Sequence, residues 1–344
     1  MSQQTVPTAT PLDQQLNPEL VQNAMALIEP AQRIALLAHE HPDGDALGSI
    51  LGFSHILSLL GKECVPVCAD PAPRAFHFLP GIEKLQTTLG DEQFDLVIAL
   101  DAGEFYRYGA IYERHSAFLE RARVLNLDHH LTSSGCGQVN IIDVASAATA
   151  ELLVLFQQQA GLPLNTDAAQ CLLTGIITDT GSFQYSNVTA RTLEAAAVLL
   201  NAGAVPEVSV KPIFRTHPLA QKRLEAEVIA KAQVACGGRL VWSYISKDML
   251  EQTGATTEMD SGCVGMLRDI EGVQVGALFK GYEEGETRLS LRTYEPVNAA
   301  DICMRLGGGG HARAAGATIY KPLEEAIPEV VALLKEAIGE GDDE

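Results

Sequence analysis

The chain has 344 residues, of which 47% are hydrophobic, and its formal net charge is −20 at pH 7. This length is more than twice the roughly 150 residues of a common domain, so we expect two domains with their own cores and exclude a chain disordered throughout. So acidic a surface also opposes binding of long DNA or RNA, because cationic side chains must replace the counterions condensed on a polyanion.

The N-terminal residues are polar and carry no targeting pattern. Residues 1–20, which begin MSQQTVPTATPLDQQ, lack the basic start and apolar core of a signal peptide, and we expect a disordered leader there. No stretch approaches the roughly 18 consecutive apolar residues of a membrane span, so we expect no association with a membrane. The seven cysteines form no CxxC pair, which predicts reduced thiols in a cytoplasmic protein rather than a zinc ribbon.

Short apolar runs alternate with helical patterns in the first half of the chain. The runs are, in order, RIALLAH, ECVPVC, FDLVIALD, ARVLNLDHH and QVNIID. They lack a clean polar alternation, which indicates a parallel sheet covered on both faces. Helical patterns follow at about 147–160, 166–178 and 189–203. We therefore predict a doubly wound α/β domain, with a mainly parallel sheet, over residues 21–204.

A connector and a smaller domain are predicted next. The segment AVPEVSVKPIFRTHPLA contains three prolines and predicts an inter-domain connector over residues 205–221. Beyond it, strand-like RLVWSYIS, helix-like SGCVGMLRDI, and the runs VQVGALFKGY and TRLSLRTYE separated by EEGE predict an α+β domain with a hairpin. This second domain is expected over residues 222–344 and ends in an amphipathic helix.

Four clusters of acidic or histidine residues follow predicted strands or end a predicted helix. They are His39, Asp43 and Asp45 after the first strand, Asp101 after LVIAL, Asp128, His129 and His130 after VLNL, and Asp179 at the end of LLTGIITD. In an open α/β sheet, ligands bind outside the carboxyl ends of the strands. We therefore expect the clusters to meet at one edge of the sheet.

Each cluster alone also fits a simpler interpretation, such as a turn, a helix cap or a buried polar network. Together these groups would repel one another or stay unpaired unless cations bound among them. A mixture of carboxylate and imidazole favours Mn, Co, Fe or Zn over Ca. The sequence thus predicts a metal centre at the edge of the sheet.

The same residues resemble a known family. HEHPDGDALGS, the lone Asp101, DHH and TDTGSF occur in the order and spacing of the four motifs of the DHH phosphoesterase superfamily, and GGGGHARAAG is similar to the glycine-rich motif of its DHHA1 domain. The resemblance extends over residues 30–340. In its length, the chain is similar to members of the short branch of this superfamily, which includes nanoRNases and phosphatases of 3′-phosphoadenosine-5′-phosphate (pAp).

The resemblance implies two divalent cations, with Mn²⁺ expected and Mg²⁺ or Co²⁺ as alternatives, and it implies a role for each motif residue. One cation would be held by His39, Asp43 and Asp101, and the other by Asp45, Asp101, His129 and Asp179. Asp101 would bridge the two cations, while Asp128 and His130 would orient ligands or contact the phosphate. His41 receives no ligand role.

Substrate binding is expected mainly in the second domain. Gly308, Gly309 and Gly310 would let the backbone approach a phosphate and turn N–H groups toward it, and His311 follows them. The resemblance also places Arg292 toward the substrate. The alternatives are a loose glycine turn and a solvent-facing arginine. Gln184 stands where related sequences often have Arg, which weakens any inference of a phosphate contact from that loop.

Three functions remain open at this point. The first is hydrolysis of short oligoribonucleotides to nucleoside 5′-monophosphates and of pAp to AMP. The second is a soluble phosphodiesterase acting on cyclic di-AMP or its linear product pApA. The third is a nucleotide-binding regulator with an inert metal site, which predicts a broken ligand set, whereas all the motif positions are filled. A homodimer is compatible with each.

Overall fold

The computed structural model of the chain describes residues 16–90, 93–260 and 262–339. The chain divides into two compact units, Met1–Thr216 and His217–Glu344. Most of the expected leader, residues 1–15, lies outside the described residues, as do residues 340–344. Helix α1 (Pro18–Ile28), capped by the side chain of Asn17, begins inside the expected leader, so residues 18–20 are helical rather than disordered.

The first unit contains a five-stranded, fully parallel sheet in the order β2-β1-β3-β4-β5. The strands are β1 (Arg33–Ala38), β2 (Glu63–Cys68), β3 (Leu96–Leu100), β4 (Val124–Asp128) and β5 (Val139–Ile142). The chain passes from β1 to β2 on one side and then returns to β3 on the other. The strand order therefore reverses between β1 and β3, which is where ligands bind in such sheets.

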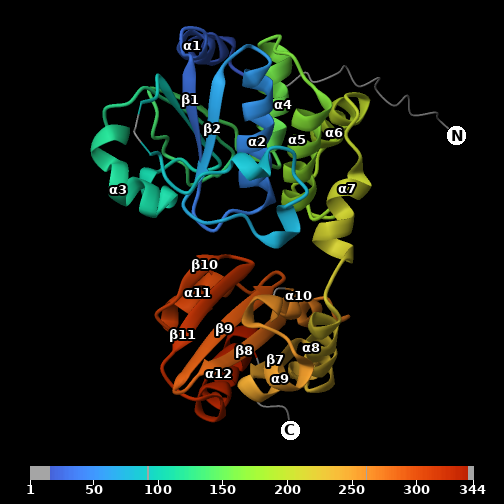
Figure 1. Cartoon of the computed structure of the whole chain (residues 1–344). Helices are drawn as coiled ribbons and strands as arrows, with labels where there is room; N and C mark the ends of the chain where they lie inside the picture. The colour runs from blue at the N-terminus through green and yellow to red at the C-terminus, as the bar shows by residue number, and fades with distance from the viewer. Residues whose placement is uncertain (1–15, 91–92, 261, 340–344) are drawn as a thin grey trace, which may run out of the picture. The chain divides into compact units, whose positions relative to one another are not determined.

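Helices cover both faces of this sheet, as predicted for a doubly wound domain (Figure 1). Helices α2 (Gly44–Ser58), α4 (Thr149–Gln159), α5 (Thr166–Asp179) and α6 (Ala190–Asn201) lie on one face, and α3 (Ala110–Leu119) lies on the other. In β1, Ile34 and Leu36 join the core under the first group, while Ala35 and Leu37 join the core under α3. Burial on both faces explains why these strands show no polar alternation.

Helices α2 and α5 pack unusually closely because glycine faces the contact on both sides. A Cβ atom at Gly48 would lie 2.5 Å from the carbonyl oxygen of Cys171, and one at Gly175 would lie 2.6 Å from a carboxylate oxygen of Asp45. No larger residue fits there without moving a helix. This contact brings the first turn of α2 next to the last turn of α5.

The predicted connector is mostly helical, and its first part belongs to the first unit. Helix α7 (Pro206–Val210) is followed by a π-helical turn over Lys211–Arg215, and the division between the units comes after Thr216. The buried hydroxyl of Ser209 lies 2.8 Å from the amide nitrogen of Gln170 and 2.7 Å from the hydroxyl of Thr174, both on α5. Residues 206–215 are thus anchored to α5 rather than forming an irregular linker.

The second unit has a six-stranded sheet in the order β10-β11-β9-β8-β7-β6, antiparallel except between β7 and β8. Its strands are β6 (Gln233–Ala235), β7 (Leu240–Ser246), β8 (Val275–Glu283), β9 (Glu286–Thr293), β10 (Gly309–His311) and β11 (Ala314–Ile319). Its helices are α8 (Leu219–Ala230), α9 (Lys247–Thr253), α10 (Cys263–Arg268), α11 (Ala299–Arg305) and α12 (Leu323–Ile338). The predicted α+β domain with a β8–β9 hairpin is confirmed.

All seven cysteines are unbridged, as the sequence predicted. Among the described residues, no single helix is long and apolar enough to cross a membrane, although α6 and the segment Pro206–Arg215 together, sharply bent, meet the criteria of length and composition.

Candidate metal centre

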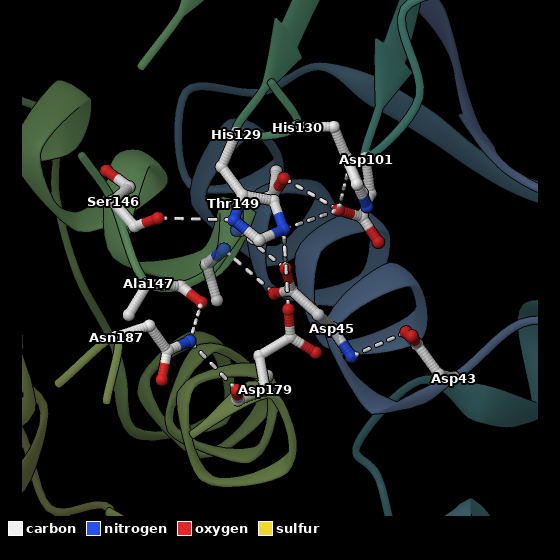
Figure 2. A network of polar contacts seen from close by, with 12 residues as sticks. Asp43, Asp45, Asp101, His129, His130, Ser146, Ala147, Thr149, Asp179 and Asn187 are labelled. Atoms are coloured by element: carbon white, nitrogen blue, oxygen red, sulfur yellow. Dashed lines mark hydrogen bonds and ion pairs between the residues drawn. The ribbon is translucent and has the colours of Figure 1, made fainter. Parts of the chain in front are cut away.

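The predicted ligand residues converge at the carboxyl edge of the parallel sheet, and Figure 2 labels all of them except His39. The end of β1 supplies His39, the end of β3 supplies Asp101, and the end of β4 supplies His129. Asp43 caps α2, Asp45 lies in its first turn, and Asp179 is the last residue of α5. The close packing of α2 on α5 therefore places the two helix ends beside the strand ends.

The potential ligand atoms fall into three overlapping groups, each with its atoms within 4.8 Å of one another. The groups are His39 with Asp43 and Asp101, Asp45 with His129 and Asp179, and Asp101 with His129 and His130. The first group is the predicted ligand set of one cation. The second holds three of the four predicted ligands of the other, and the carboxylate of Asp101 lies 3.6 Å from His129.

The imidazole of His129 is oriented as a metal ligand would be. Its Nδ1 lies 3.2 Å from the carbonyl oxygen of Ser146, which can only accept, so Nδ1 carries a proton and Nε2 is the nitrogen directed at the carboxylates. Nε2 faces carboxylate oxygens of Asp179 at 3.3 Å and Asp45 at 3.9 Å. Within the described part of the chain this nitrogen is buried and has no hydrogen-bond partner. A cation would satisfy it.

His39 shows the same arrangement. Its Nδ1 lies 2.7 Å from the carbonyl oxygen of Glu40, and its Nε2 lies 3.4 Å from Asp101 and 3.9 Å from Asp43. By contrast, the neighbouring His41 contacts Asp70, with 3.0 Å between its Nδ1 and the carboxylate. The structure therefore groups His39 with the cluster and places His41 outside it.

Backbone and hydroxyl groups fix the two most buried carboxylates among the predicted ligands, Asp45 and Asp101. The amide N–H groups of Thr149 and Ala150 donate to the two oxygens of Asp45, at 2.6 Å and 2.9 Å. The hydroxyl of Thr149 donates to Asp101 at 2.8 Å. Asp101 itself has a left-handed backbone with φ +62°, which is uncommon for a residue other than glycine and is often found at functional sites.

The electrostatics of the cluster favour a cation. Burial raises the pKa of Asp179 to about 6, and it raises the pKa of Asp45 well above its usual range. Burial alone would lower the pKa of His129, but its contact with Asp179 and the nearby charges raise that pKa to about 10. Without cations, protonated imidazole therefore offsets the buried carboxylates. Divalent cations would replace these protons, so the donor set fits them.

Asp128 and His130 form a pair beside the cluster. The imidazole Nδ1 of His130 donates to the buried carboxylate of Asp128 at 2.7 Å and lies 3.8 Å from Asp101. This contact raises the pKa of His130 above its usual value. The pair thus holds a partly exposed imidazole, with its proton on Nδ1, at the rim of the predicted centre.

Residues 143–150, which form the loop between β5 and α4 and the first turn of α4, were not predicted to take part in the site. Ser146, Thr149 and Ala150 contact three of the predicted ligands, and the amide of Asn187 bridges the carbonyl oxygens of Ala147 and Asp179 at 3.1 Å and 3.0 Å (Figure 2). The topology of the sheet could have indicated this segment. This segment follows a parallel strand and therefore lies at the same edge as the other clusters.

Arg292 and His311, two of the predicted substrate residues of the second unit, lie in one register row of its sheet. Arg292 on β9 is paired with Ala314 on β11, which is paired in turn with His311 on β10. The side chain of His311 lies outside the described part of the structure. The guanidinium of Arg292 donates to the carbonyl oxygen of Leu291 at 3.0 Å.

The glycines of the run 308–310 have structural roles in the second unit. The N–H of Gly308 donates to the carbonyl oxygen of Cys303 at 2.8 Å, which ends α11, so the expected use of this N–H toward a phosphate does not hold. Gly309 and Gly310 form the edge strand β10.

Gln184 is engaged within its own loop. Its side-chain amide donates to the carbonyl oxygen of Gly181 at 2.8 Å, and residues 181–183 all have left-handed backbones.

Comparison with known proteins identifies both parts of the chain. Residues 33–176 match the N-terminal domain of the DHH family, and residues 237–340 match the DHHA1 domain. The chain is 34% identical over 310 residues to the bifunctional oligoribonuclease and PAP phosphatase NrnA of Thermus thermophilus, which covers 89% of this chain and 90% of that protein. The protein of the same name from Bacillus subtilis is 28% identical, with 83% and 89% covered.

A solved structure has the same fold. The crystal structure of an exopolyphosphatase-related protein from Bacteroides fragilis superimposes with a TM-score of 0.86 at 22% identity, covering 94% of this chain and 98% of that one.

Proposed function

The chain belongs to the DHH phosphoesterase family and is a phosphoester hydrolase, and we propose that it degrades short oligoribonucleotides to nucleoside 5′-monophosphates and converts pAp to AMP. The similarity to the Thermus thermophilus oligoribonuclease and PAP phosphatase over nearly the whole of both chains supports these substrates. The observation that carries the proposal is the buried, unsatisfied Nε2 of His129, surrounded by carboxylates of Asp45, Asp101 and Asp179.

Two divalent cations would be held by the six predicted ligands, with Asp101 contributing to both. We propose His39, Asp43 and Asp101 for one cation, and Asp45, Asp101, His129 and Asp179 for the other. When bound, such cations activate a water molecule and stabilise the negative charge that develops on phosphoryl oxygens. They also supply positive charge where an acidic protein would repel a phosphate.

The chain's own groups position the phosphate and the ligands. The backbone N–H groups of Thr149 and Ala150 hold Asp45 in place, so that little reorganisation is needed when charge develops. We propose that His130, whose Nδ1 proton is held by Asp128, donates from Nε2 to an oxygen of the scissile phosphate. Asp128 would thus act by orienting His130.

Substrate length is expected to matter steeply. The net charge of −20 argues against a long cationic track, so we expect oligomers of two to five nucleotides to be preferred over long single strands. Steady-state kcat/KM on RNAs of increasing length measures this preference. Equal rates on a dinucleotide and a long RNA would contradict it.

Arg292 and His311 are proposed to bind a substrate phosphate away from the scissile bond. A charge-assisted hydrogen bond to phosphate contributes about 1.5–3 kcal/mol, so we expect Arg292→Ala to lower kcat/KM on short RNA roughly ten- to a hundredfold. The loss should be much smaller on bis-p-nitrophenyl phosphate, which has no second phosphate, and Mn²⁺ binding should be unchanged.

A matched control lies on the same strand. Arg288, also on β9, is largely exposed and pairs with Glu286, so Arg288→Ala should keep activity on both substrates. Equal losses on both substrates for Arg292→Ala would mean that this residue supports the fold or the chemistry rather than holding a distal phosphate.

The substrate assignment is tested by a direct comparison. The purified chain with Mn²⁺ is incubated separately with pAp, pApA, a five-residue RNA and cyclic di-AMP, and kcat/KM is ranked. We expect pAp and the short RNAs to lead, with cyclic di-AMP the poorest substrate. Preference for cyclic di-AMP would favour the cyclic dinucleotide phosphodiesterase instead, and no hydrolysis of any of them would overturn the proposal.

A further inference from the structure

The loop between β5 and α4, residues 143–148, supports several groups of the proposed metal centre. The carbonyl oxygen of Ser146 fixes Nδ1 of His129 (Figure 2). The first turn of α4, which follows at once, donates through Thr149 and Ala150 to the oxygens of Asp45. A shift of this loop would therefore disturb the orientation of an imidazole and of a buried carboxylate together.

A single arginine on α6 ties this loop to α4. The Nε of Arg191 donates to Glu151 at 2.8 Å, and one terminal nitrogen donates to Asp143 at 2.8 Å and to the hydroxyl of Ser146 at 3.1 Å. The other carboxylate oxygen of Glu151, which is fully buried, accepts the N–H of Ala147 at 3.0 Å. The side chain of Arg191 is only 11% exposed, so these contacts are shielded from water.

The contacts of Arg191 divide between two kinds of task. Its bond to Glu151 neutralises a buried charge, which stabilises the fold. Its bonds to Asp143 and Ser146 hold the residue whose carbonyl oxygen orients His129. No predicted metal ligand touches Arg191 among these contacts, so Ser146 and His129 would lie between it and a cation.

We propose that Arg191 is a positioning residue for the metal centre, and that it sets cation affinity by holding the β5–α4 loop against His129. This inference rests on the proposed metal centre. Outer hydrogen-bond partners that orient a metal-bound imidazole are typically worth about ten- to a hundredfold in metal affinity. We therefore expect loss of Arg191 to weaken Mn²⁺ binding by that factor, chiefly at the cation held by His129.

The variants must separate positioning from stability. Arg191→Met leaves the buried Glu151 without a counter-charge, so a lower melting temperature is expected. The double variant Arg191→Met with Glu151→Gln removes that charge while keeping an oxygen that can accept the N–H of Ala147. Arg191→Lys keeps the charge without the forked geometry and should bind Mn²⁺ with intermediate affinity. Leu193→Ala, at an exposed position on the same helix, is the matched control.

The experiment measures Mn²⁺ binding by titration calorimetry on the full chain, beside thermal unfolding without metal. We expect two binding steps in the wild type and in Leu193→Ala, and a ten- to hundredfold weaker step in Arg191→Met that stays weak in the double variant although its melting temperature recovers. If Mn²⁺ affinity recovered together with stability in the double variant, or stayed unchanged in Arg191→Met, the role of Arg191 would be overturned while the proposed metal centre would stand. A wild-type chain that binds no Mn²⁺ would overturn the proposed metal centre with it.

Discussion

Asp101→Asn is expected to abolish turnover at every Mn²⁺ concentration, because the proposed bridging carboxylate serves both cations. In the structure this carboxylate lies 3.4 Å from His39 and 3.6 Å from His129, the imidazoles of the two proposed ligand sets. Cations stabilise developing phosphoryl charge by several kcal/mol, so we expect kcat to fall by roughly a thousandfold or more. Turnover of pAp and of a short RNA across a range of Mn²⁺ concentrations measures this.

Asparagine is a cleaner replacement than alanine at this position. Asp101 has φ +62°, and asparagine tolerates the left-handed region better than alanine does. Its amide oxygen could still accept the hydroxyl of Thr149, so the fold should persist. Thermal unfolding checks this, and Asp167→Asn, at an exposed site on α5, serves as the control. A kcat near normal in Asp101→Asn would show that the bridge is assigned wrongly.

The parallel sheet could be predicted from the sequence because burial on both faces leaves a plain signature. Ile34 and Leu36 face one core while Ala35 and Leu37 face the other, so β1 reads as a continuous apolar run. The convergence of the candidate ligands followed from the same topology, since the carboxyl ends of parallel strands share one edge. Side-chain chemistry and strand order together were therefore enough to locate the cluster.

The parts that could not be predicted depend on backbone groups and on context. Ser146 acts through its carbonyl oxygen and Ala150 through its N–H, and such groups leave no residue signature. The prolines predicted an irregular connector, but Pro206 is the first residue of α7. At that position the missing N–H of proline costs no hydrogen bond, so the helix is not broken. Arg191 contacts residues that lie 40 to 48 positions earlier in the chain, so only the fold reveals its contacts.

Removal of metal is expected to abolish activity on every substrate, whatever its length. The proposed centre joins two imidazoles, of His39 and His129, to the carboxylates of Asp43, Asp45, Asp101 and Asp179. Ca²⁺ prefers six to eight oxygen ligands, whereas Mn²⁺ accepts imidazole together with carboxylate. After exhaustive chelation and dialysis, we therefore expect Mn²⁺ to restore most of the original rate and Ca²⁺ only a small fraction. Initial rates on pAp and on a short RNA measure the recovery.

The comparison between ions discriminates between two roles for the cluster. If the cations only neutralised buried carboxylates, any divalent ion that binds would restore the rate, and Ca²⁺ would nearly match Mn²⁺. If binding of the cations also requires imidazole ligands, His129→Ala should weaken both Mn²⁺ binding and activity. The Nε2 atom of His129 faces the carboxylates of Asp45 and Asp179 directly. Full activity after complete removal of metal would end the two-cation interpretation. The carboxylates would then have to be explained as a proton-sharing network neutralised by protonated histidines.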